Sequence, residues 1–247
     1  MVDRLAGRAE YGAGGGIVAD SVCDDEYTEA LLKARVLTEQ PSDFSLLETM
    51  LWTPEDDYFL LEYHLRRLAN SAIYFDYPLD TRGARDLLLE RIAGFSGMPQ
   101  RVRLLVARDG AVEIQAVPLA AAEAARPVRL KLAVDPVDSA EVFLYHKTTH
   151  RRVYEAARQG SRDCDDVLLW NERGELTESC VSNVVVAIDG DLFTPPVDSG
   201  LLAGTFRSWL LDQGRIRERV LKVGDLGKCS KIYLINSVRK WQEAVLL

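Results

Sequence analysis

Lys147 is the residue of this sequence whose setting most suggests reactivity. It lies in the segment Leu144-Tyr-His-Lys-Thr-Thr-His150, between an expected strand and an expected helix. Crowding by Tyr145, His146 and Thr148 would partly desolvate the amine, and desolvation lowers the pKa of a lysine towards nucleophilic use. A solvated surface lysine is the common alternative, and this segment alone favours it.

A second ionisable residue, Glu178, lies among small polar side chains in the segment Thr177-Glu-Ser-Cys-Val-Ser-Asn183, before an apolar strand. Its carboxylate could form an ion pair with the nitrogen of a ligand ring, or it could cap a turn. Small hydroxyl and amide residues are typical of turns, so the segment by itself predicts a turn.

Groups that bind anions occur at three further places. The segment Gly200-Leu-Leu-Ala-Gly-Thr-Phe-Arg-Ser208 enters an expected helix, whose free N–H groups would form either an anion site or an ordinary capped end. The segment Tyr63-His-Leu-Arg-Arg-Leu68 puts two arginines into the first turn of another expected helix. Residues 234–239 end a strand with hydroxyl and amide groups.

Residues that ligate metals are scattered along the chain. His146 and His150 could share a helix face, but no third ligand is near them in the sequence. The cysteines, at positions 23, 164, 180 and 229, form no Cys-x-x-Cys pair. We therefore expect no metal, and cysteines that stay reduced as in a cytosolic protein.

The composition is that of a globular protein without a membrane span. The chain has 247 residues, of which 47% are hydrophobic and 28% charged, and a net charge of −8. No apolar run approaches the ~18 residues that a span needs, and the first residues lack the apolar core of a secretory signal. The acidic charge argues against binding to nucleic acid. We therefore expect a cytoplasmic protein, with neither a membrane nor a nucleic acid as partner.

Hydrophobic periodicity predicts two α+β units joined by a low-complexity connector at 118–127. In the first unit, strands are expected at 44–52 and 58–62, helices at 63–75 and 81–95, and a hairpin of 101–107 with 111–117 around Asp109-Gly110. In the second unit, strands are expected at 128–134, 165–170, 184–188, 217–223 and 232–236, and helices at 150–159 and 204–214.

The residues that carry chemistry occur in a specific order. Along the chain come His-x-x-Arg-Leu, Lys147, Thr-Glu-x-x-x-Ser-Asn, Gly-Thr-x-Arg and Asn-Ser. Over 44–247, this order resembles the fold type IV pyridoxal phosphate enzymes, the class IV aminotransferases. The resemblance implies a two-domain α+β fold similar to D-amino-acid aminotransferase, with a small domain at 42–118 and a larger cofactor-binding domain at 127–247.

Within this family, the segments Tyr145-His-Lys-Thr-Thr, Gly200-Leu-Leu-Ala-Gly-Thr-Phe-Arg and Asn236-Ser-Val-Arg are most similar to the aminodeoxychorismate lyases. One departure is Ala203, where the family commonly has proline before Gly-Thr. We expect this change to alter only the stiffness of the loop.

The resemblance implies the cofactor pyridoxal 5′-phosphate and a role for each matching residue. Lys147 would hold the cofactor covalently and move protons at its face, and Glu178 would keep the pyridine nitrogen protonated. The residues implied to bind the phosphate are Arg67, the amides of Thr205 and Phe206, and the hydroxyl of Ser237. Ser182 and Asn183 would shape the edge of the cofactor.

The reaction implied by the resemblance is the elimination of pyruvate from 4-amino-4-deoxychorismate, which gives 4-aminobenzoate for folate synthesis, in a homodimer. The two substrate carboxylates need cationic or amide partners. The candidates are His146, Arg207, Asn236, Arg239 and Lys240. Two alternatives stay open: a branched-chain or D-amino-acid aminotransferase that uses the same lysine and glutamate, and a non-catalytic partner of a synthase.

The first 38 residues have a resemblance of their own. Segments 10–20 and 26–34 are similar to the C-terminal end of the chorismate-binding component of aminodeoxychorismate synthase, so 1–38 is expected to be a remnant of such an enzyme. Glu29 falls at a metal-ligand position of that family. Because the rest of that active site is absent, we expect neither a metal nor synthase activity.

Overall fold

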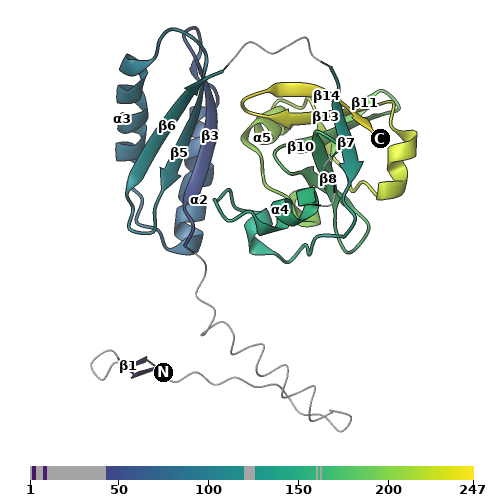
Figure 1. Cartoon of the computed structure of the whole chain (residues 1–247), viewed down its shortest axis with the longest axis horizontal. Helices are drawn as coiled ribbons and strands as arrows, with labels where there is room; N and C mark the ends of the chain where they lie inside the picture. Colours follow the sequence, from purple (N-terminus) through teal and green to yellow (C-terminus); the bar gives the residue numbers. More distant parts are fainter. Residues whose placement is uncertain (1, 4–7, 10–42, 120–125, 160, 162) are drawn as a thin grey trace. The chain divides into compact units, whose positions relative to one another are not determined.

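Residues 2–3, 8–9, 43–119, 126–159, 161 and 163–247 are described by the computed structural model (Figure 1). The chain divides into two units, Met1–Asp43 and Phe44–Leu247. In the first unit, β1 (Val2–Asp3) pairs antiparallel with β2 (Arg8–Ala9). The synthase-like segments and Glu29 lie outside the described residues.

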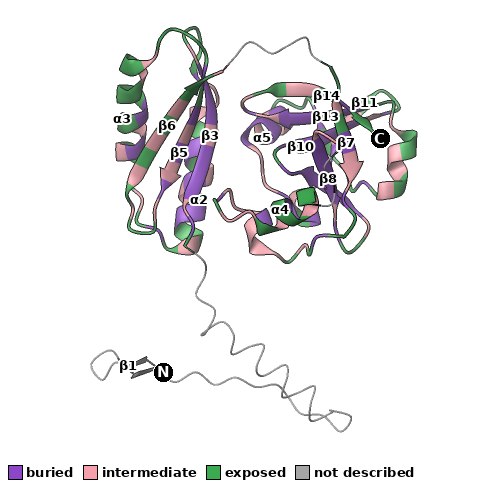
Figure 2. Cartoon of the chain, viewed as in Figure 1, coloured by how far each residue is buried: buried purple, intermediate pink, exposed green. Residues whose placement is uncertain are grey.

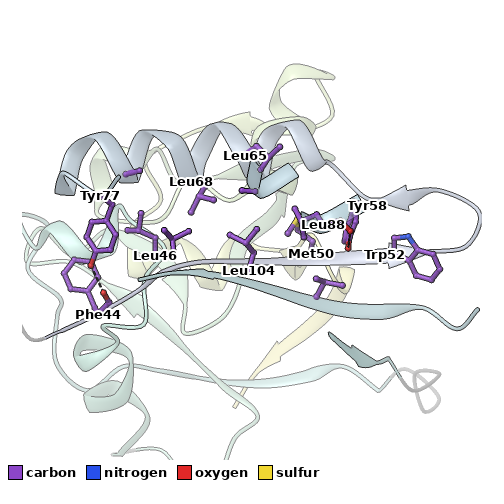
Figure 3. Packing of buried hydrophobic residues seen from close by; sticks show 14 residues of the cluster. Phe44, Leu46, Met50, Trp52, Tyr58, Leu65, Leu68, Tyr77, Leu88 and Leu104 are labelled. Carbon is purple, nitrogen blue, oxygen red and sulfur yellow. Dashed lines mark hydrogen bonds between the residues drawn. The ribbon is translucent and has the colours of Figure 1, made fainter. Parts of the chain in front are cut away.

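The first lobe of the second unit, residues 44–118, is a four-stranded antiparallel sheet with two helices on one face; we call it the small lobe. Its strands, in spatial order, are β4 (Asp57–Tyr58), β3 (Leu46–Thr53), β5 (Gln100–Val106) and β6 (Val112–Pro118). Its helices are α2 (Leu61–Phe75) and α3 (Thr81–Arg91). Figure 3 shows α2 running along the sheet with the apolar core between them.

The core of the small lobe consists of side chains from both layers. Leu65 and Leu68 of α2 point towards Leu46 and Leu104 of the sheet (Figure 3). Leu46 and Leu104 are fully buried, and each such side chain contributes ~1.5–3 kcal/mol by leaving water. At one end, the hydroxyl of Tyr77 donates a hydrogen bond to the backbone carbonyl of Phe44, two residues before β3. The polar tip of a buried ring therefore has a hydrogen-bond partner.

Strand β5 presents different chemistry on its two faces. Val102, Leu104 and Val106 are buried, whereas Arg101 is exposed and Arg103 is half-buried. Because side chains alternate along a strand, the two arginines project from the face of the sheet opposite the helices.

The second lobe, which we call the large lobe and which spans 126–247, is built on an eight-stranded sheet. Its strands, in spatial order, are β12 (Arg217–Glu218), β11 (Asp191–Thr194), β10 (Asn183–Ile188), β13 (Lys231–Asn236), β14 (Lys240–Leu246), β7 (Val128–Leu132), β8 (Asp166–Trp170) and β9 (Leu176–Ser179). Asn183 of β10 also pairs with Glu178 of β9, which closes six of the strands into a ring. Figure 2 shows β8 and β10 largely buried. The helices are α4 (Arg152–Gln159) and α5 (Thr205–Asp212).

Most predicted elements of the small lobe are confirmed. The predicted hairpin forms around Gly110. Glycine is required there for two reasons: its φ is 88°, and an added Cβ would lie 2.4 Å from the carbonyl oxygen of Pro78. The predicted strand 58–62 is wrong beyond Tyr58. Leu60 adopts a left-handed φ of 59°, and the chain enters α2 at Leu61, two residues earlier than predicted.

Three predictions for the large lobe need correction. The turn expected around Glu178 is wrong, because Leu176–Ser179 is a strand whose residues are all buried. The strand expected at 217–223 is limited to Arg217–Glu218, and Val223–Lys228 is a 3-10 helix. Strand β14, which follows β13 after a tight turn, was not predicted.

Among the described residues, no helix combines the length and the apolar character needed to cross a membrane.

Candidate active site

A cavity of about 410 Å³ lies between the small lobe and the large lobe. From the small lobe, β3, α2 and β5 contribute side chains, and from the large lobe, β9, β10, the start of α5 and the end of β13 do so. The predicted site residues that line the cavity are Arg67, Lys147, Glu178, Ser182, Asn183, Thr205, Asn236, Ser237 and Arg239. Residues far apart in the sequence therefore meet in one cleft.

Lys147 is held at the cavity by strand-like pairing of its segment with β3. The backbone N–H of Leu47 donates to the carbonyl of Lys147 at 3.0 Å, and Leu46 forms an antiparallel bridge with Thr148. The side chain enters the cavity, where burial, aided by the positive charge of Arg67, lowers the pKa of the amine to about 8. At pH 7, about a tenth of the amine is therefore neutral and nucleophilic.

Glu178 of β9 is a buried carboxylate whose hydrogen bonds, within the described part of the chain, come from neutral donors. The Tyr154 hydroxyl donates to Oε1 at 2.8 Å, the Leu202 N–H donates to Oε1 at 3.2 Å, and the Asn183 side-chain amide donates to Oε2 at 3.1 Å. Burial raises the pKa of Glu178 to about 7, although these hydrogen bonds oppose the shift. A cationic N–H group of a ligand at this carboxylate would find a buried counter-charge.

Another part of the cavity lining, which we call its anion end, is suited to an anion. Arg67 of α2 is fixed by Glu48, to which Nε donates at 2.8 Å and Nη2 at 2.6 Å, and it also reaches the carbonyl of Ala203 at 3.1 Å. Helix α5 begins at Thr205 without a side-chain cap, so the N–H groups of its first turn have no intrahelical partner. A cation and a helix N-terminus together form an anion site.

Gly204, directly before α5, permits a close approach that no other residue would. A Cβ at this position would lie 1.9 Å from Oδ1 of Asn183. Asn183 in turn donates to both Glu178 and the carbonyl of Leu202, so it links the carboxylate end of the cavity to the loop before the helix. Ser237 also lines the cavity and donates to the carbonyl of Thr49 at 3.1 Å.

The structure does not bring four of the predicted residues to the cavity lining, and the first is Arg207. Its guanidinium is buried, bonds to Glu218 at 2.5 Å and to the carbonyl of Pro195 at 2.7 Å, and so ties α5 to the strand that contains Glu218. As a correction, Arg207 is part of the packing of the large lobe and is not available to a substrate carboxylate.

His146, Phe206 and Lys240 also lie outside the lining. The ring of His146 lies 2.9 Å from the Ser71 hydroxyl and packs at a tilt against the ring of Tyr74. As a correction, His146 is not placed to contact a substrate in the cavity. Lys240 lies over the ring of Phe59, at 4.6 Å from its centre. The ring of Phe206 packs in an aromatic cluster, which leaves only its backbone N–H for the anion end.

Sequence reasoning missed several residues of the cavity. Tyr154 supports Glu178, and Arg151 donates to the carbonyl of Cys180 while its guanidinium covers the ring of Tyr154. Arg101 and Arg103 reach the cavity from the outward face of β5. The signal for these two arginines was present in the sequence, as charged residues at every second position of an otherwise apolar strand.

Among the described residues, no group of three or more histidine, cysteine, aspartate or glutamate side chains could hold a metal ion.

Comparison with known proteins identifies the families that this chain resembles. Residues 45–246 match the family described as amino-transferase class IV, and residues 4–39 match the family described as chorismate binding enzyme. A Schizosaccharomyces pombe protein assigned as an aminodeoxychorismate lyase is 32% identical over 211 residues, which cover 82% of this chain and 90% of that protein.

Two solved structures extend the comparison. A Mesorhizobium loti protein assigned as an amino-acid aminotransferase is 36% identical, with a TM-score of 0.78 over 83% of this chain and all of that one. A hypothetical aminotransferase from Mycobacterium tuberculosis in a PLP-bound form is 24% identical, with a TM-score of 0.70 over 82% of this chain and 80% of that one, and this likeness shows the fold alone.

The raised pKa of Glu178 predicts a pH-dependent effect on stability. A carboxyl whose pKa is higher in the folded state than its ordinary 4.5 stabilises the fold at low pH, and this contribution is lost as the pH rises from about 4.5 to about 7. Glu178→Gln cannot ionise. Between pH 4.5 and pH 8, we therefore expect the free energy of unfolding of the variant to gain on the order of 1–3 kcal/mol over that of the unmutated protein.

Urea titration of the ligand-free protein at both pH values measures this difference. Glu62→Gln is the matched control, because Glu62 has a side chain that is 71% exposed, and its difference should stay constant within about 0.5 kcal/mol. A difference for Glu178→Gln that does not change with pH would contradict the assignment of a buried, unpaired carboxylate.

Proposed function

The chain belongs to the class IV aminotransferase family, and from this membership we propose that it is a pyridoxal 5′-phosphate-dependent lyase. It eliminates pyruvate from 4-amino-4-deoxychorismate and forms 4-aminobenzoate. The observation that carries the proposal is that a lysine of lowered pKa and a buried, unpaired glutamate share one cavity with an anion-binding end. The S. pombe relative, which this chain matches over 90% of its length, supports the choice of reaction.

The donor set of the cavity fits pyridoxal 5′-phosphate. Lys147 would bind the aldehyde carbon, Glu178 would face the pyridine nitrogen, and Arg67 would take the phosphate. The further residues that would hold the cofactor are Ser182, Asn183, Ser237 and the backbone N–H groups of Thr205 and Phe206. Gly204 lets Asn183 pack against the segment before α5, because a Cβ there would collide with the Asn183 side chain.

When bound, the cofactor supplies an electron sink that is conjugated to the substrate amine. Glu178 holds a proton at the pyridine nitrogen, which strengthens the sink, and a cationic nitrogen there lowers the pKa of the carboxyl again. Lys147 Nζ removes the proton from the ring carbon that bears the amine. Its pKa of about 8 suits this transfer near neutral pH.

The elimination balances without a further reactant. The electron pair of the broken C–H bond forms a ring double bond as the neighbouring C–O bond breaks, and the enolpyruvyl oxygen leaves with the electron pair of the C–O bond. A proton then converts the departing enolate to pyruvate, while the remaining ring becomes aromatic. Because aromatisation makes the step strongly favourable, the chain mainly has to orient the substrate and position the amine of Lys147.

Two substrate carboxylates require cations at the mouth of the cavity. Arg101 and Arg103 from β5 and Arg239 from the turn after β13 line it, and all three can donate to carboxylate oxygens. Asn236 also lines the cavity, and its side-chain amide donates to the Ser182 hydroxyl at 2.8 Å. We propose that these arginines recognise a dianionic substrate.

The second candidate function is an aminotransferase for branched-chain or D-amino acids. It uses the same lysine and glutamate, and the likeness to the M. loti aminotransferase favours it. The match of 4–39 to the chorismate-binding family favours the lyase, since it places a segment of a family named for a related substrate in the same chain. A non-catalytic partner of a synthase is disfavoured by the retained lysine and glutamate.

We also propose a cytoplasmic homodimer that supplies 4-aminobenzoate to folate synthesis, because this family builds its site at a subunit interface. Sedimentation equilibrium tests the dimer, and a fully active monomer would contradict it.

The lyase assay is the direct test of the proposed reaction. Purified protein loaded with the cofactor is mixed with 4-amino-4-deoxychorismate, and 4-aminobenzoate is followed by its fluorescence. We expect product to form, and Lys147→Ala to lower the rate by at least about 10³-fold, because the variant lacks the group that moves the proton. Amino-group transfer to 2-oxoglutarate without 4-aminobenzoate would establish the aminotransferase instead.

The position of Arg103 in the cavity lining predicts that its replacement weakens substrate binding. Arg103→Gln should raise KM about tenfold or more through the lost charge-assisted hydrogen bonds, with kcat changed less than about threefold. Arg82→Gln is the control, because Arg82 is exposed on α3, the helix that covers the other face of the sheet. A fall in kcat at unchanged KM would show that Arg103 acts on the reaction step and not on binding.

A further inference from the structure

Two buried residues outside the cavity lining connect Arg67 with the start of α5, the two parts of the anion end. Glu48 of β3 and His64 of α2 are both almost wholly buried, with 1% and 0% of their surface exposed. Nδ1 of His64 lies 2.6 Å from Oε2 of Glu48, and Nε2 lies 3.2 Å from Oγ1 of Thr205, the first residue of α5. Glu48 also accepts both hydrogen bonds that orient Arg67.

The direction of these hydrogen bonds follows from the protonation states. Burial would raise the pKa of Glu48, but the charge of Arg67 and the hydrogen bonds from Arg67 and His64 outweigh it and hold the pKa at about 2, so the carboxylate only accepts. Burial lowers the pKa of His64, against the attraction of Glu48, so the ring is neutral at neutral pH. Nδ1–H therefore donates to Glu48, and Nε2 accepts from the hydroxyl of Thr205.

The hydrogen bonds of His64 and Arg67 join the small lobe to the large lobe at the anion end of the cavity. His64 and Arg67 are three residues apart on α2 and so share one helix face. One of them reaches Thr205, and the other reaches the carbonyl of Ala203, two residues earlier in the same segment. Glu48 holds both side chains, so one carboxylate orients both groups that reach the segment 203–205.

Of the five N–H donors of Arg67, three are used within the described part of the chain, by Glu48 and Ala203. Two remain for an anion. They can act together with the N–H groups of α5 only if the two lobes hold a fixed distance, and a misplacement of about 1 Å weakens such a site strongly.

We propose that Glu48 and His64 are positioning residues that build the phosphate-binding site of the cofactor from two lobes, by fixing Arg67 against the start of α5. Neither residue lines the cavity, so neither touches the cofactor. The inference rests on the proposed cofactor but not on which reaction the enzyme catalyses.

The test compares two ligands that differ only in the phosphate. Equilibrium dialysis of the full, cofactor-free chain measures the Kd of pyridoxal 5′-phosphate and of pyridoxal. His64→Leu replaces the neutral ring by an apolar side chain of similar volume. We expect the Kd of pyridoxal 5′-phosphate to rise about tenfold from the lost hydrogen bonds, and that of pyridoxal to change less than about twofold.

Tyr63→Phe is the matched control. Tyr63 directly precedes His64 on α2. Its hydroxyl donates to Asp212 at 2.7 Å, so it also links α2 to α5, but at an exposed site. We expect neither Kd to change. If Tyr63→Phe caused the same phosphate-specific loss, any link between the helices would suffice, and the proposal would be overturned.

Thr205→Val is the second variant, and it decides the matter if His64→Leu does not fold. It removes the hydroxyl that donates to His64, with little change of shape, and leaves the backbone N–H of position 205 in place, so it should also weaken pyridoxal 5′-phosphate selectively. An equal loss for both ligands, or no loss for either, would overturn the proposal. Because the readout is binding, failure of the lyase assay would leave this result intact.

Glu48→Gln is a less direct probe, because its two effects oppose each other. It releases Arg67 and His64, which weakens the site, but it also removes a negative charge near the bound phosphate, which favours the anion. For this reason the neutral replacements of His64 and Thr205 are used.

Discussion

Lys147 and Glu178 carry opposite charges into one cavity and do not pair with each other, and this separation is the constraint on which the site depends. Each group loses hydration without an ion-pair partner among the described residues, so the pKa of the amine falls to about 8 and that of the carboxyl rises to about 7. The pairing of the Lys147 segment with β3, and the hydrogen bonds from Tyr154 and Asn183 to Glu178, keep the two apart. The space between them suits a ligand with a reactive carbonyl and a basic ring nitrogen.

The two-lobed architecture follows from this constraint. The small lobe brings the cations, Arg67 from α2 and Arg101 and Arg103 from β5, whereas the ring of strands in the large lobe brings Glu178 and the start of α5. Each lobe has its own apolar core, so the polar contacts at the cleft are not what holds either lobe together. Those contacts are then free to set geometry.

The sequence predicted the elements with strong local patterns and missed those that depend on tertiary contacts. The hairpin at Asp109-Gly110 has its own turn chemistry and is confirmed. Strand β9 was read as a turn because Thr177, Glu178 and Ser179 are typical turn residues, and only burial between neighbouring strands explains their extended conformation.

The residues of the site divide in the same way. Lys147 and Arg67 lie in recognisable motifs, and the structure brings both to the cavity. Arg207 belongs to a motif as well, but its partner Glu218 lies on a short strand that local sequence does not predict, so its packing role could not be foreseen.

Chemical mapping of the cofactor is the most direct test of the whole account. The protein loaded with pyridoxal 5′-phosphate is reduced with borohydride, digested and analysed by mass spectrometry. The account predicts a pyridoxyl group on Lys147 and loss of the absorbance near the visible edge, and a stable adduct on another lysine, or none at all, would contradict it.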